Sequence, residues 1–135
     1  MTVQLSVAVR NARLDAIEST IGVSAKLKIR TGAQPSSCVA ADTGTIIATA
    51  DLPADYMDPA GSGTKAKAGT WEDPTADANG TAGHWRLYAT DGTTCGAQGS
   101  CTATGGGGDM ELDNVSINAG QQVTITAWTF TDGNS

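Results

Sequence analysis

The hydrophobic period of the chain changes at Gly22, and this change constrains the fold more than any other feature. Before Gly22, the apolar residues Val7, Leu14, Ile17 and Ile21 recur at helical spacing. After it, small or apolar residues alternate with polar ones in short runs, which is typical of half-buried strands. The pattern predicts an amphipathic helix of about twelve to fourteen residues, ended by the glycine and followed by β structure.

Short strands separated by turn residues are expected along the rest of the chain. Asp91-Gly92 supplies the turn of the clearest hairpin. Residues 54–68 and 74–82 are expected to be loops, with at most one helical turn near 54–57. This pattern predicts a mostly-β fold, an antiparallel β-sandwich or barrel with one N-terminal α-helix. The expected strands cover residues 25–30, 45–52, 69–71, 84–90, 93–104, 109–112, 115–117 and 122–130.

The length of 135 residues fits one domain with one core. Within it we expect residues 1–22 to form an N-terminal amphipathic helical segment and residues 23–135 to form the β-sandwich domain. Aromatic residues make up only 4% of the chain. The core is therefore expected to have few large side chains, and part of the stability is expected to come from partners.

The apolar face of the predicted helix has two possible destinations. It either packs on the sheet of its own domain or contacts a neighbouring molecule, and the spacing does not separate the two. Val7, Leu14, Ile17 and Ile21 are accordingly the candidate partner-interface residues.

The charge balance argues against nucleic acid as a partner. Eight Lys and Arg against 14 Asp and Glu give a net charge of −6, whereas proteins that bind phosphate backbones carry basic patches. No apolar run approaches the roughly 20 residues of a membrane helix. The N-terminus also lacks the charged start and apolar block of a signal peptide. We expect a soluble protein made in the cytosol, with neither nucleic acid nor membrane among its partners.

Cys38, Cys95 and Cys101 are expected to be reduced thiols in a reducing compartment. Cys95 and Cys101 are a possible pair if the protein later leaves the cell. There is no C-x-x-C motif, and His84 is the only histidine. We therefore expect no metal site and no cofactor.

No pattern of residues predicts catalysis, so we expect a protein that is not an enzyme. His84 begins a predicted strand and is expected to pack or to satisfy a hydrogen bond rather than to activate a nucleophile. The four glycines at 105–108 lack the Lys-Ser/Thr and the helix of a phosphate loop. Asp109, Glu111 and Asp113 alternate, and a solvated acidic strand face explains them better than a calcium site.

The three tryptophans, Trp71, Trp85 and Trp128, are candidates either for the core or for an exposed carbohydrate-binding platform. Since few other aromatic residues are available to build a core, burial is the stronger expectation.

Several stretches resemble a known family. They cover residues 9–18, 27–32, 80–88, 105–109 and the closing 118–121 with its Thr-rich strand. Over nearly its full length, the chain resembles small proteins encoded in the structural-gene modules of tailed bacteriophages and prophages. The resemblance implies a virion structural protein, first of all a capsid decoration (cement) protein that stabilises the head by bridging capsid subunits. It also leaves a head–tail or tail component, and a host-glycan-binding adhesion module, as alternatives.

The same resemblance implies the partners and the location. The expected partners are the major capsid protein or other virion proteins, and the chain itself is expected to form a homo-oligomer. Its expected location is the virion, assembled in the cytoplasm of the host bacterium. No motif of the resemblance carries a functional residue to a position of this sequence.

Overall fold

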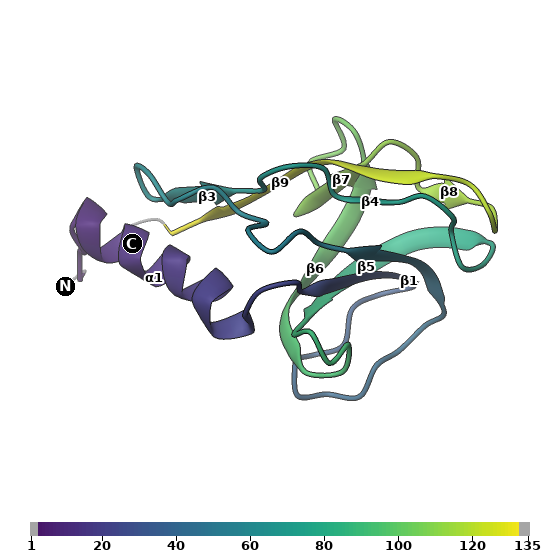
Figure 1. Ribbon diagram of the computed structural model, residues 1–135, viewed down its shortest axis with the longest axis horizontal. Coiled ribbons are helices and arrows are strands. Elements are labelled where there is room, and N and C mark those ends of the chain that lie inside the picture. The colour runs from purple at the N-terminus through teal and green to yellow at the C-terminus, as the bar shows by residue number, and fades with distance from the viewer. Residues whose placement is uncertain (1–2, 133–135) are drawn as a thin grey trace.

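The helix α1 (Val7–Ile21) lies at one end of an elongated molecule (Figure 1). The computed structural model describes residues 3–132. The Oγ atom of Ser6 accepts a hydrogen bond from the Val9 N–H at 3.2 Å, which caps the first turn. Gly22 ends the helix, with φ at +95° and its N–H donating to the Glu18 carbonyl at 2.8 Å. The helix predicted before Gly22 is confirmed.

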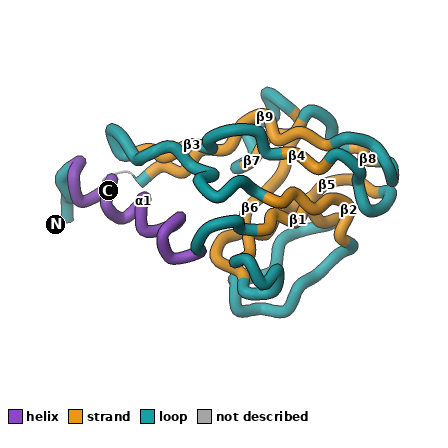
Figure 2. Tube along the Cα trace, viewed as in Figure 1, coloured by secondary structure: helices purple, strands orange, loops and turns teal. Residues whose placement is uncertain are grey.

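Nine strands follow the helix and form a curled, mixed sheet that resembles half a barrel (Figures 1 and 2). The strand order is β2-β1-β5-β6-β7-β9-β3, with β4 paired to β9 and β8 paired to β5. The predicted mostly-β fold with one N-terminal helix is therefore confirmed. The strands are β1 (Lys26–Thr31), β2 (Ile46–Asp51), β3 (Thr64–Ala66), β4 (Glu72–Asp73), β5 (Gly80–Tyr88), β6 (Cys95–Ala103), β7 (Met110–Leu112), β8 (Ser116–Ile117) and β9 (Val123–Thr131).

One strand pair departs from the antiparallel pattern expected from the sequence. β6 and β7 are parallel, with Cys101 opposite Met110. Parallel neighbours usually need a long crossover, but here residues 104–109 suffice. Gly105 and Gly107 take positive φ values of +86° and +80°, so the chain folds back within a few residues. The tetraglycine is thus the feature that allows β7 to lie beside β6 in this direction.

The segment expected to be a loop at 54–68 contains a strand. β3 pairs with the end of β9, Lys65 lying opposite Phe130, and no helical turn forms at 54–57. The strand expected at 69–71 is displaced to β4 at Glu72–Asp73. Pairing with β9 explains both differences. β3 and β4 are strands because they form hydrogen bonds with β9, which is distant in the sequence, and local residue patterns do not predict such pairing.

The core is built around the three tryptophans. All are buried, and the ring centroids of Trp71 and Trp85 lie 4.9 and 5.7 Å from that of Trp128. The Phe130 ring centroid lies 4.1 Å from that of Trp128, and the two rings are inclined at 62° in an edge-on arrangement, a favourable geometry for aromatic pairs. The expectation that the tryptophans fill the core is confirmed.

Candidate functional site

Polar side chains of α1 hold the helix against β3. The Lys65 side chain is only 3% exposed, and its Nζ donates to Asp15 Oδ1 at 2.8 Å and to the Asp58 carbonyl at 2.9 Å. Glu18 Oε2 lies 3.5 Å from the same Nζ. We call Asp15, Glu18 and Lys65 the helix clamp. A buried ammonium group needs such partners, since its desolvation is otherwise costly.

Backbone groups complete the contact on the same face of the helix. The N–H groups of Tyr56 and Ala60 donate to Glu18 Oε1 at 3.2 Å and to Asp15 Oδ1 at 2.9 Å. Asn11 Oδ1 accepts from the Gly63 N–H at 2.9 Å. Hydrogen bonds from Lys65 and from the Ala60 backbone lower the pKa of Asp15 below its ordinary value of 3.8. The Asp15 carboxylate is therefore ionised at neutral pH.

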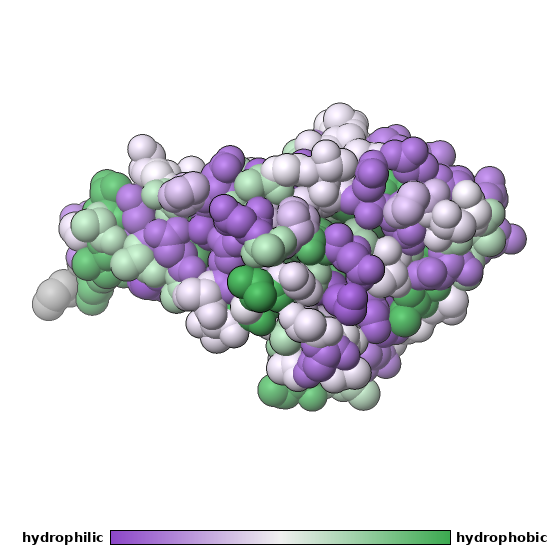
Figure 3. All heavy atoms as spheres, in the orientation of Figure 1, coloured by the Kyte–Doolittle hydropathy of each residue, from purple (hydrophilic) through white to green (hydrophobic). Residues whose placement is uncertain are grey.

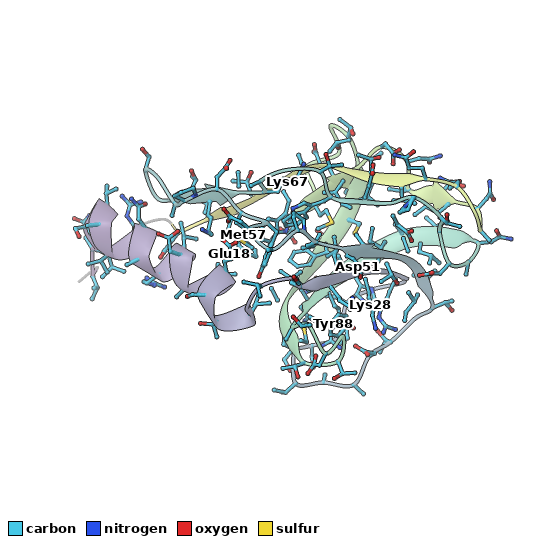
Figure 4. The ribbon with its side chains drawn as sticks, in the orientation of Figure 1. Glu18, Lys28, Asp51, Met57, Lys67 and Tyr88 are labelled. Atoms are coloured by element: carbon cyan, nitrogen blue, oxygen red, sulfur yellow. The ribbon has the colours of Figure 1, made fainter. Side chains whose placement is uncertain are left out.

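The start of the helix is also tied to the end of the last strand. Arg10 Nη1 donates to the Asp132 carbonyl at 3.1 Å, and Arg13 Nε lies 3.2 Å from Asp132 Oδ2. These contacts join residues far apart in the sequence, as Figure 1 shows where α1 lies beside β3 and the end of β9. Figure 4 shows Glu18 beside Met57, where the chain leading into β3 passes the helix. The helix is thus fixed to its own β domain at several points.

The four candidate partner-interface residues have different environments in the single chain. Leu14 is 4% exposed, and Ile17 and Ile21 are partly buried against the core. Val7 is 47% exposed. A Cβ at Gly96 would lie 2.4 Å from Ile21 Cγ1, so the absence of a side chain there lets the end of the helix approach β6 closely. Of the four, Val7 is the one that the fold leaves open to a partner.

Exposed valines extend this open surface along the N-terminal end of the chain. Val3 is 72% exposed and Val9 is 46% exposed. Hydrophobic (green) spheres gather at this end of the molecule in Figure 3. We call Val3, Val7 and Val9 together the valine patch. Val7 and Val9 are two positions apart and lie on different sides of the helix, so the patch surrounds the start of α1 rather than covering one face. Exposed apolar side chains gathered at one end of a molecule are candidates for contact with another molecule.

A groove lies further along the helix, between the C-terminal half of α1 and the hairpin of β5 and β6. It has a volume of about 390 Å³, and Ala16, Ile17, Ile21 and Gly96 are among its lining residues. Its apolar lining comes from the same side chains whose inner faces pack on the core. The helix therefore presents partly apolar surface along its flank as well as at its start.

A second polar cluster anchors the long loop of residues 32–45, which crosses below β1 and β5 in Figure 2. The buried guanidinium of Arg86 donates to the carbonyls of Ser37, Cys38 and Ala40 at 2.9–3.3 Å. It also contacts the carboxylate of Asp42. One side chain of β5 thus replaces the backbone partners that an irregular loop lacks.

The same carboxylate has further partners on the sheet. Tyr88 donates its hydroxyl to Asp42 Oδ1 at 2.6 Å, and Arg30 Nη2 lies 3.1 Å from Asp42 Oδ2. Burial acts to raise the pKa of Asp42, but the hydrogen bonds from Tyr88 and Arg86 outweigh it, so the pKa is lowered. Lys28 lies over the ring of Tyr88, with its Nζ 5.0 Å from the ring centroid (Figure 4). This face of the sheet is occupied by its own loop.

The residues considered for chemistry have structural partners instead. His84 is buried, as expected, with Nδ1 2.9 Å from the Gly32 carbonyl. Asp109, Glu111 and Asp113 each accept a hydrogen bond from a different backbone N–H, those of Ser100, Gly107 and Thr124. Among residues 3–132, no group of three or more His, Cys, Asp or Glu is arranged to hold a metal ion. No helix in that range is long and apolar enough to cross a membrane.

The helix clamp was not found from the sequence. Asn11, Asp15 and Glu18 recur at the spacing of one helical face. That polar stripe was the available signal. Its partner Lys65 lies in a segment that the sequence presented as a loop.

No protein-family model, curated protein or solved structure matches this chain.

Proposed function

We propose that this chain is a structural component of a tailed-bacteriophage particle, and specifically a capsid decoration protein that bridges capsid subunits. The valine patch is the observation that carries the proposal, because it places exposed apolar area at the projecting end of the molecule. The resemblance of residues 9–18 and 80–88 to phage structural proteins supports the same class. The role is exerted by contact rather than by catalysis.

The helix clamp gives this contact its mechanism. A surface that is already held in one conformation loses little entropy on binding, and Lys65 fixes α1 through Asp15 and Glu18. The valine patch meets the capsid, while the β domain covers the junction between subunits. Many symmetric copies on one particle then add their individually modest contacts, since multivalent binding raises the apparent affinity.

Cosedimentation with capsids that lack the protein tests the proposal. The wild-type chain is expected to bind saturably, at a copy number that matches the symmetry of the capsid. The double variant Val3→Asp/Val7→Asp is expected to bind at least about tenfold more weakly, because it places charges in an apolar contact. The matched control is Val23→Asp/Val39→Asp, which changes two exposed valines outside the valine patch and is expected to bind like the wild type.

Two results would contradict parts of this proposal. No saturable binding of the wild type to capsids would remove the decoration role, and binding to tails instead would assign the chain to the tail. Equal binding of the two double variants to capsids would contradict the proposal that the valine patch contacts the capsid. Sedimentation of the free protein in the same experiment measures the homo-oligomer that we propose alongside the capsid contact.

A host-glycan-binding role remains the alternative from another class. It requires an aromatic surface on which a sugar ring can stack, and Trp71, Trp85 and Trp128 are all buried. The structure therefore offers no observation in its favour.

A further inference from the structure

Two of the three cysteines lie in contact across the sheet surface. Cys38 belongs to the loop of residues 32–45, and Cys95 is the first residue of β6. Their Sγ atoms are 2.7 Å apart, and both residues are partly exposed. They are 57 positions apart in the sequence, so the tertiary fold alone brings them together.

The sequence-based pairing of Cys95 with Cys101 does not fit this arrangement. Tyr88 lies opposite Cys95 and Leu87 lies opposite Ala97, which leaves Gly96 as the extra residue of a β-bulge. The bulge places Cys95 on the face of the sheet covered by the loop. Cys101 is buried in the hydrophobic core, on the other face.

The loop is held in the position that the contact requires. Arg86 Nη2 donates to the carbonyl of Cys38 itself at 2.9 Å. Gln98, also on β6, donates from Nε2 to the Pro35 carbonyl at 2.7 Å. Hydrogen bonds at Pro35 and at Cys38 therefore fix this part of the loop. Because the loop is already ordered, bringing Cys38 to Cys95 requires no further loss of conformational entropy.

The surroundings of Cys95 favour its protonated thiol. Burial and the hydrogen bond to Cys38 raise the pKa of Cys95 to about 11, against a smaller opposing effect of the Arg86 charge. Cys95 is thus the donor, and the sulfur of Cys38 is the acceptor. The direction of this contact assigns Cys38 as the sulfur that attacks first and Cys95 as the one that resolves.

We propose that Cys38 and Cys95 are a site of oxidative modification, and that a small-molecule disulfide such as oxidised glutathione converts them into an intramolecular disulfide. The Cys38 thiolate attacks one sulfur of the oxidant, forms a mixed disulfide and expels one glutathione thiolate. Cys95 then loses its proton, attacks Cys38 Sγ and expels the second glutathione. The two cysteines are oxidised, one oxidised glutathione is reduced to two thiols, and Cys101 takes no part.

The cross-link fastens the loop of residues 32–45 to the start of β6. It also closes a ring that contains β2, β3, β4 and β5, which restricts the unfolded chain more than the folded one. We therefore expect the oxidised chain to melt about 5–15 °C above the reduced chain. The proposal does not depend on the phage role, because it concerns a reaction of the isolated protein.

The test is peptide mapping of the wild-type chain after incubation with oxidised glutathione, with free thiols alkylated before digestion. The expected result is one disulfide between the peptides that contain Cys38 and Cys95, with a mass loss of about 2 Da. Cys101 is expected to be alkylated only after denaturation. A disulfide that includes Cys101, or alkylation of both Cys38 and Cys95 after incubation, would overturn the proposal.

Variants of Cys95 and Cys101 sharpen the test. Cys95→Ser is expected to stop at the mixed disulfide on Cys38 and to lose the rise in melting temperature. Cys101→Ala is the matched control and is expected to form the cross-link and to keep the rise. Full cross-linking in the first variant would overturn the assignment of Cys95, and mapping of the wild type decides the question if either variant does not fold.

Discussion

The β core and the attachment of α1 are held together by different forces. In the core, Trp128 contacts two other buried tryptophans and Phe130, and hydrophobic burial dominates. At α1, Leu14 is the one buried apolar residue of the helix, and the contact depends mainly on Lys65 and the carboxylates around it. One region is apolar and continuous, and the other is polar and assembled from separate contacts.

This difference separates the stability of the body from the placement of its projecting end. Apolar burial changes little with pH, whereas an ion pair requires the carboxylate to be charged. The position of α1, and with it the valine patch, is therefore adjustable by changes that leave the β core intact. The predictions below test this separation, beginning with the largest effect.

Trp128→Ala is expected to destabilise the whole chain. It removes the ring that joins Trp71 to Trp85, and a buried tryptophan cut back to alanine costs about 3–5 kcal/mol in the free energy of unfolding. Urea denaturation followed by far-UV circular dichroism measures the loss. Leu14→Ala is expected to cost about 2–3 kcal/mol. If Trp128→Ala loses no more stability than Leu14→Ala, the distinction between the β core and the attachment of α1 is contradicted.

Lys65→Met is expected to loosen α1 selectively. It keeps the length of the buried side chain but removes the cation between Asp15 and Glu18, at an expected cost of about 1–3 kcal/mol. Amide hydrogen exchange is expected to speed up in residues 7–21 and to stay slow in β5. Lys67→Met is the matched control on the same segment, and its exchange is expected to match the wild type. A uniform increase along the chain would show that the helix and the core are one cooperative unit.

Acid is expected to remove the contribution of Asp15. Because the pKa of Asp15 is lowered in the folded chain, its stabilisation is present above the ordinary pKa of 3.8 and is lost as the pH falls through the lower folded value. Asp15→Asn is therefore expected to be less stable than the wild type at pH 7 and to approach it near pH 3. This is the smallest of the three effects. A difference that stays constant between the two pH values would contradict it.

Local patterns predicted much of the fold. The spacing of Leu14, Ile17 and Ile21, ended by Gly22, identified the helix, and alternation identified β1, β2 and β5. The pairing of β3 with β9 and the parallel pairing of β6 with β7 were not predicted. They depend on partners distant in sequence or on a sharp reversal at glycines. Neither of these produces a hydrophobic periodicity in the local sequence.

The candidate site was predicted less well than the fold. Val7 was correctly placed on the helix, but the same pattern grouped it with Leu14, which the fold buries. Helical spacing identifies the apolar face of the helix, but it does not show how much of that face the β domain covers. The pairing of Lys65 with Asp15, and of Cys38 with Cys95, spans 50 and 57 positions, so both required the tertiary structure.

The pairings of β9 determine when the chain is able to finish folding during synthesis. β9 pairs with β3, β4 and β7 and carries Trp128 into the core, and the neighbouring Asp132 receives Arg10 and Arg13. While residues 123–132 are still inside the ribosome, β3 and β4 lack their partner and the core is open. β1, β2, β5 and β6 are able to pair earlier, since none of them needs β9. The nascent chain therefore exposes apolar surface to chaperones until β9 emerges.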